Sequence, residues 1–244
     1  MDGGAATKVD LNDRKPKRLS PEERKRRLLE KAIDYFSEEG FEGGTRELAR
    51  QLGITQPLIY RYFSTKADLI NEVYHAVYVS QWNDDWTRAI ETRDRPMQDR
   101  LHAFYRSYTT AIFNRRWMRI FFFAGLKGLD INTRYIRRVS AHLLQPICRE
   151  MRAELGFDPQ APLAQAELDL VWMMHGLVFY QGIREHIYKV PDPVNHGFSI
   201  EVAVDMYVNK ARSIIERSTG EQAGDPVRAG LTTLQPAQAV PGRR

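Results

Sequence analysis

A short segment near the N-terminus combines groups that contact nucleic acid with apolar residues at helical spacing. In "QPLIYRYF", Ile59 and Phe63 are one helical turn apart and would pack beneath a helix. The same helix would leave Gln56, Tyr60 and Arg61 on its outside. Amide, phenol and guanidinium groups bind base edges and phosphates, and a single helix fits the major groove of DNA. The pattern therefore predicts a helix that contacts DNA.

The preceding residues are those needed to hold such a helix in place. The stretch "RELARQL" predicts another short helix, which Thr45 would cap. Two short helices joined by a tight turn cross closely, which requires a small residue at the crossing, here Ala49. The turn requires a residue that tolerates positive φ, here Gly53. Together they predict a helix-turn-helix, with Arg46 and Pro57 joining the outward-facing set.

Capping and stop signals delimit the other helices. Ser20, in the capping sequence "SPEE", begins a first helix that ends at Gly40. Ser64 or Thr65 caps a fourth helix, which we expect to continue to about Arg93. Five further helices are predicted over residues 96–114, 117–126, 131–155 with Pro146 as a candidate kink, 162–188 and 198–217. The result is an all-α fold of nine helices without a sheet.

Composition is compatible with a nucleic-acid partner. The 244 residues carry a net charge of +5, which is mildly basic. The single cysteine, Cys148, cannot form an intramolecular disulfide, and "MDGGAATKVD" lacks the pattern of a secretory signal, so we expect a cytoplasmic protein. The most apolar stretch, "LDLVWMMHGLVFYQGI", is too short and too polar for a comfortable membrane span, so no membrane partner is expected.

Changes in composition divide the chain into four parts. Residues 1–19 predict a disordered basic arm, 20–67 a helix-turn-helix domain, 68–217 a larger helical domain and 218–244 a disordered tail. Basic residues gather in the arm and at the start of the first helix, where they form either a solvated face or a surface near DNA. We favour proximity to DNA for part of this set, which comprises Arg14, Lys15, Lys17, Arg18, Arg24, Lys25, Arg26 and Arg27.

The segment "TRELARQLGITQPLIYRYFSTKADLI" resembles the DNA-binding signature of the tetracycline-repressor (TetR) family of transcriptional regulators. The resemblance is strong over residues 20–75 and extends to the all-helical layout. It implies a sequence-specific regulator associated with the nucleoid, by default a repressor, that binds a palindromic operator in double-stranded DNA. Leu58 stands where many members have a small polar residue, and would touch a thymine methyl or nothing. Residues matching Gln56, Pro57, Tyr60 and Arg61 face the groove in such proteins, and those matching Thr45, Arg46, Tyr62 and Lys66 bind phosphates.

The resemblance also implies that the larger domain binds a small effector. This domain is rich in aromatic residues, most of which we expect in the core, and a few of which would line a cavity for a mainly apolar molecule. Neither a cofactor nor a metal is expected. The candidate effector-binding residues are Trp86, His102, Tyr105, Tyr108, Phe122, His175 and Phe179.

The last two long helices predict a two-fold homodimer. Both are apolar over most of their girth, which is typical of helices buried on most sides. Gly176 and Gly182 would let backbones approach, and two such helices from each subunit would form a four-helix interface. The alternative is that these residues serve only the internal core. The apolar positions are Leu163, Leu170, Met174, Leu177, Val178, Ile200, Val204, Tyr207, Val208, Ala211, Ile214 and Ile215.

Two other functional classes compete with a regulator. The chain lacks a nucleophile elbow, a glycine-rich phosphate loop and paired Cys or His residues at zinc spacing, so no catalytic residue is predicted. A protein that organises DNA without sequence preference would share the basic arm. It would not need an aromatic-rich domain of this size.

Overall fold

The computed structural model describes residues 19–190 and 195–224. Nearly all of the predicted basic arm, including Arg14, Lys15, Lys17 and Arg18, lies outside the described residues. Most of the predicted tail also lies outside them. In the described part of the chain every regular element is a helix, which confirms the all-α prediction.

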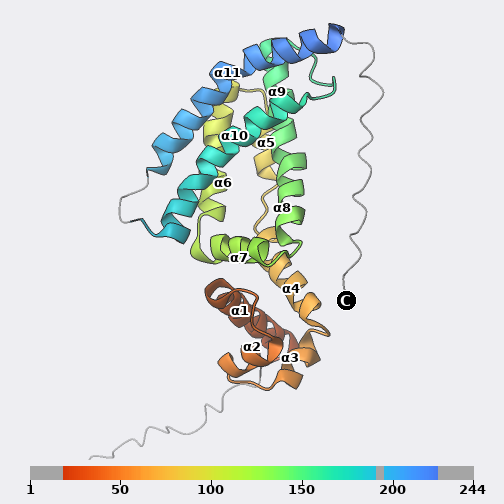
Figure 1. Ribbon diagram of the computed structural model, residues 1–244, viewed down its shortest axis with the longest axis vertical. Helices are drawn as coiled ribbons and strands as arrows, with labels where there is room; N and C mark the ends of the chain where they lie inside the picture. Colours follow the sequence, from red (N-terminus) through yellow and green to blue (C-terminus); the bar gives the residue numbers. More distant parts are fainter. Residues whose placement is uncertain (1–18, 191–194, 225–244) are drawn as a thin grey trace, which may run out of the picture.

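The N-terminal unit is a small bundle. It contains α1 (Pro21–Glu39), α2 (Thr45–Gln51), α3 (Gln56–Tyr62) and the start of α4 (Lys66–Tyr74), which continues through a π-helical turn, η1 (His75–Val79). Figure 1 shows that α4 rises out of this unit into the larger domain. Ser20 caps α1 by accepting a hydrogen bond from the Glu23 amide, and Gly40 ends the helix with a φ of 73°.

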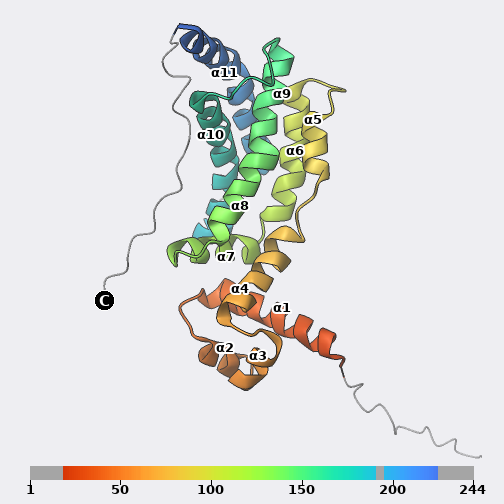
Figure 2. The ribbon, with the colours of Figure 1, turned by 90° about the vertical axis from the view of Figure 1, so that its right-hand side faces the viewer.

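The larger domain is built from longer helices. In Figures 1 and 2, α7 lies across the lower end of this domain, between the upright helices and α1. The elements are α5 (Asp85–Glu91), α6 (Met97–Ile112), α7 (Arg115–Leu126), α8 (Ile131–Val139), η2 (Ser140–Leu144), α9 (Gln145–Leu155), α10 (Gln165–Gly182), η3 (Ile183–Tyr188) and α11 (His196–Gly224).

Counting each uninterrupted helix once, residues 19–190 and 195–224 form ten helices, where nine were predicted. The helix predicted to run to Arg93 is two helices, because the chain turns after Ser80. Asn83 then accepts a hydrogen bond from the Asp85 amide at 2.9 Å, and α5 begins at Asp85 with Asp84 in the N-cap position. At the other end of the domain, α11 continues past the predicted end at Arg217 to Gly224.

The candidate kink at Pro146 takes the form of a π-helical turn. The helix from Ile131 to Leu155 is continuous, but its hydrogen bonds widen over Ser140–Leu144, immediately before the proline. Proline has no amide hydrogen, and its ring clashes with the carbonyl group four residues earlier, so the preceding turn must widen.

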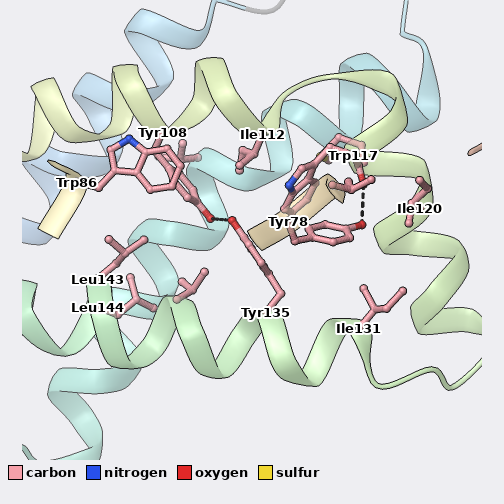
Figure 3. Packing of buried hydrophobic residues seen from close by; sticks show 14 of the residues in the cluster. Tyr78, Trp86, Tyr108, Ile112, Trp117, Ile120, Ile131, Tyr135, Leu143 and Leu144 are labelled. Carbon is pink, nitrogen blue, oxygen red and sulfur yellow. Dashed lines mark hydrogen bonds between the residues drawn. The ribbon is translucent and has the colours of Figure 1, made fainter. Parts of the chain in front are cut away.

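Aromatic residues link α4 to the larger domain through a continuous core. The Tyr78 hydroxyl donates a hydrogen bond to the Trp117 carbonyl oxygen at 3.1 Å, and the Tyr108 and Tyr135 hydroxyls are 2.9 Å apart (Figure 3). The Trp117 ring also packs edge-on against Tyr78 and Tyr135. Each buried hydroxyl therefore has a partner, which removes most of the cost of burying it.

A buried ion pair positions the start of α10. The Arg152 guanidinium donates to both carboxylate oxygens of Glu167, at 2.7 and 2.5 Å, and both side chains are almost fully buried. Arg152 also donates to the carbonyl oxygens of Ala161 and Pro162. These contacts hold the preceding loop, so α10 begins at Gln165 and not at the predicted Pro162.

Candidate nucleic-acid interface

The turn between α2 and α3 has the predicted geometry. Gly53 adopts a φ of 65°, in the left-handed region that glycine enters without strain. Ala49 is 3% exposed, and its carbonyl oxygen accepts a hydrogen bond from the Ile54 amide at 3.0 Å. Beneath α3, Ile59 and Phe63 are buried in the core. The helix-turn-helix predicted from the sequence is therefore present.

The outer side of α3 carries the predicted polar set. Pro57, Tyr60 and Arg61 are exposed, and Gln56 is half-buried. Arg46, near the start of α2, is also exposed. The Tyr60 ring is 42% exposed, which is unusual for a large aromatic residue and leaves it available to a partner.

Thr45 differs from its prediction in two respects: it does not cap α2, and its side chain is buried against α3. Gly44 takes the N-cap position of α2, so Thr45 is the first residue of the helix and not its cap. Its side chain turns toward α3, where Gln56 Nε2 donates to Thr45 Oγ1 at 2.8 Å and the Tyr60 hydroxyl lies 2.9 Å away. Thr45 is only 7% exposed. The structure therefore brings three of the predicted DNA-contacting residues into one hydrogen-bonded group.

Lys66 holds the loop between α1 and α2. Its Nζ donates to the carbonyl oxygens of Phe41 and Gly43 at 3.1 and 3.0 Å. Of the two candidate caps for α4, it is Thr65 that accepts from the Asp68 amide. An ammonium group has three hydrogens, so two contacts leave one N–H of Lys66 for another acceptor. The remaining predicted phosphate contact, Tyr62, is half-buried against the core.

Basic residues near the helix-turn-helix differ in how far their charge is already paired. The Arg50 guanidinium donates to both carboxylate oxygens of Glu47, and this bond lowers the pKa of Glu47 to about 2. Lys25 forms an ion pair with Glu72. By contrast, Arg24 and Arg26 are exposed on α1 and form no ion pair within the described residues. These two arginines, like the exposed Arg46 and Arg61, therefore carry positive charge that no carboxylate of the described residues pairs with.

Ion pairs that the sequence analysis did not anticipate join α7 to α1. Arg115 donates to both carboxylate oxygens of Glu38, and Arg116 pairs with Glu30 and Asp34. Two arginines in the first turn of a helix are unfavourable against its dipole, because that end carries partial positive charge. This local mismatch in "NRRW" was a usable signal that the arginines have acidic partners elsewhere.

Most of the candidate effector-binding residues belong to the packed core. Trp86, Tyr105, Tyr108 and His175 are 4%, 0%, 1% and 8% exposed. The Tyr105 hydroxyl lies 3.4 Å from His175 Nδ1, and burial lowers the pKa of His175 to about 4. These four side chains, contributed by α5, α6 and α10, therefore form one contiguous aromatic group.

Of the other three candidates, Phe122 and Phe179 lie at the edge of this group. Phe122 and Phe179 are half-buried and stack on each other with ring centroids 6.4 Å apart. His102 is set apart from them, with its Nε2 4.0 Å from a carboxylate oxygen of Asp205 in α11.

The outer surface of α10 and α11 is unusually apolar. The two helices pack along each other, as Figure 1 shows, and residues such as Met174, Val178 and Val204 fill the space between them and the domain core. Of the apolar positions predicted for a dimer, only Leu177 is exposed, and the others are buried or half-buried within the described residues, as the alternative of an internal core expects. The exposed apolar side chains on these two helices are Met173, Leu177, Tyr180, Phe198, Val202 and Met206.

A helix-turn-helix unit joined by α4 to a larger all-α domain defines a class of transcriptional regulators. Residues 28–73 match the bacterial regulatory proteins of the tetR family. The match to the transcriptional regulator LuxR of Vibrio harveyi has 36% identity over 61 residues, which is 25% of this chain and 30% of that protein. The N-terminal unit is therefore similar to that of the tetR family, and the chain matches the LuxR regulator over about a third of that protein's length.

Solved structures of transcriptional regulators share the fold over most of the chain. A putative transcriptional regulator from Pseudomonas aeruginosa PAO1 has a TM-score of 0.57 and 22% identity, covering 81% of this chain and 96% of its own. A tetR-family regulator from Streptomyces coelicolor has a TM-score of 0.51 and 19% identity, covering 84% and 87%. Within the part of the chain that the structure describes, no helix is long and apolar enough to cross a membrane.

Proposed function

We propose that this protein is a sequence-specific DNA-binding repressor that acts in the bacterial cytoplasm. Residues 20–67 would bind DNA, with α3 in the major groove and Arg46 and Lys66 against phosphates. The observation that carries this proposal is the exposed set Pro57, Tyr60 and Arg61 on a helix whose opposite side is buried. Such a helix presents base-reading groups on a rigid support.

The exposed apolar surface of α10 and α11 supports a homodimer. A patch that includes Met173, Leu177 and Met206 would be costly to leave in water, and a second copy of the same surface would cover it. Two recognition helices related by a two-fold axis read a palindrome with half-site centres about 34–36 Å apart. We therefore propose a palindromic operator, with residues 68–217 serving dimerisation and effector binding.

An effector would act by inserting between aromatic side chains of the larger domain and moving the helices that carry them. Tyr78, at the end of the long helix that begins with α4, bonds to the backbone of Trp117 in α7, and α7 contacts α1 through Arg115 and Arg116. A small, mainly apolar molecule inserted among Phe122, Phe179 and their neighbours would shift α7 and α4. Release of DNA requires that this molecule prefer the displaced arrangement, because equal affinity for both would shift nothing.

The direct test is selection of bound duplexes from a random DNA library, followed by mobility-shift titration. We expect the selection to enrich a palindromic duplex, and unrelated DNA should fail to displace that duplex from the protein. Tyr60→Ala should weaken binding to it by about 1–3 kcal/mol, whereas Tyr188→Ala, at a ring 62% exposed in the larger domain, should not. A protein that enriches no sequence and is displaced equally by any duplex would instead be a DNA organiser.

A further inference from the structure

Two side chains of the proposed DNA-binding surface converge on the hydroxyl of a third, buried residue. Gln56 and Tyr60 are four residues apart on α3, so they lie on the same side of that helix. Both are within hydrogen-bond distance of Thr45 Oγ1, at 2.8 and 2.9 Å. Thr45 belongs to α2 and is 7% exposed, whereas Tyr60 is 42% exposed. The hydroxyl therefore sits behind the surface that its two partners present.

We propose that Thr45 is a positioning residue that determines the sequence selectivity of α3, an inference that rests on the proposed DNA-binding function. Its hydroxyl fixes the rotamers of Gln56 and Tyr60 before DNA arrives. Thr45 is suited to this role because a β-branched side chain at a buried helical position has few accessible rotamers. Glutamine and tyrosine side chains ordered in advance lose less entropy when they bind a base.

The hydrogen-bonding capacity of the three groups is consistent with this role. A hydroxyl has one donor hydrogen and two acceptor lone pairs, so Thr45 accommodates both partners at once. Gln56 uses one of its two amide hydrogens on Thr45, which leaves its carbonyl oxygen and its second N–H for a partner. The contact to Thr45 therefore orients Gln56 without consuming its capacity to read a base edge.

This role differs from the phosphate contact that family resemblance implies for Thr45. A phosphate contact would contribute equally on every sequence, because phosphates carry no sequence information. A positioning contact contributes only where Gln56 and Tyr60 read a matching base. The two roles therefore separate when binding to the selected site is compared with binding to altered and unrelated duplexes.

The test compares Thr45→Val, which removes the hydroxyl and keeps the shape, with Thr45→Ser, which keeps the hydroxyl. A matched control is Thr110→Val in α6, whose hydroxyl bonds to the carbonyl oxygen of Arg106. Each protein is titrated with the selected duplex, with single-base variants of it and with unrelated DNA. Thermal unfolding checks that each variant is folded.

Thr45→Val should reduce the ratio of affinities between selected and altered sites by about threefold to tenfold, the range expected for the net contribution of one hydrogen bond. Affinity for unrelated DNA should stay unchanged, and Thr45→Ser should retain most of the selectivity. Wild-type selectivity in a folded Thr45→Val protein, or an equal loss on all sequences, would overturn the inference. If the unmodified protein selects no sequence, the proposed function itself fails, and this inference fails with it.

Two further measurements keep the inference testable if Thr45→Val does not fold. Tyr60→Phe removes one of the two bonds at an exposed site and should lower selectivity in the same direction. In the DNA-free protein, the side-chain amide of Gln56 should show restricted motion by ¹⁵N relaxation in the wild type and in Thr110→Val. A freely rotating Gln56 amide in the wild-type protein would contradict preorganisation.

Discussion

The Arg119 guanidinium in α7 donates a hydrogen bond to the carbonyl oxygen of Glu38 in the last turn of α1, with 2.9 Å between Nη2 and the oxygen. The same group also donates to the carbonyl oxygen of Ser37. The last carbonyl groups of a helix lack partners within it and carry partial negative charge, so a cation is favoured there. A residue of the larger domain thus caps a helix of the proposed DNA-binding unit.

Replacing Arg119 by methionine should loosen this connection. The variant leaves two helix-end carbonyl oxygens without a charged donor, and we expect a loss of about 1.5–3 kcal/mol in the free energy of unfolding. Urea unfolding measures the loss, and hydrogen exchange should accelerate in the last turn of α1. Arg212→Met is the matched control, because Arg212 pairs only with Glu216 on the exposed side of α11 within the described residues. Equal stability of the two variants would show that Arg119 does not hold α1.

Lys66→Met separates two roles of one ammonium group. Loss of the contacts to Phe41 and Gly43 should destabilise the loop between α1 and α2 and lower the melting temperature. If the third N–H also contacts a phosphate, binding should weaken on all sequences, and the slope of log K against log salt should fall by about 1. Lys210→Met, at an exposed position in α11, serves as the control. An unchanged slope would assign Lys66 to the loop alone.

The exposed apolar surface predicts that one lysine will disrupt the dimer. Met206 is 58% exposed on α11, and a charge placed there would be buried without a partner in a two-fold interface. In size exclusion with light scattering, the wild-type protein should have about twice the chain mass of 28.3 kDa. The mass of Met206→Lys should shift toward that of the monomer. Leu126→Lys, at a position 86% exposed at the end of α7, should leave the mass unchanged. A wild-type mass of one chain at micromolar concentration contradicts the dimer.

Stability should fall in mild acid because of His175. Burial lowers its pKa from 6.5 to about 4, so between these values the unfolded chain binds a proton that the folded chain does not. The resulting loss in the free energy of unfolding is small above pH 6.5, grows as the pH falls and reaches about 3 kcal/mol near pH 4. His175→Gln should flatten the pH dependence of unfolding over this window, whereas replacing the exposed His142 by Gln should not. If His175→Gln and His142→Gln show the same pH dependence of the free energy of unfolding, the acid sensitivity belongs to other groups.

Features set by neighbouring residues could be predicted from the sequence alone. The caps of α1 and α4, the positive φ at Gly53 and the buried position of Ile59 follow from signals within a few residues of each site. Helix capping and backbone conformation depend on contacts within one or two turns, so the helix-turn-helix could be recognised without any tertiary information.

Only the tertiary structure decided which side of each apolar helix faces outward and which polar groups meet. Met174 is buried and its neighbour Met173 is exposed, although both are equally apolar in the sequence. Thr45 turns away from its own helix toward Tyr60, and Arg119 meets Glu38 from a distant part of the chain. Such contacts arise from how helices cross, and crossing depends on packing across the whole core, which short-range patterns do not encode.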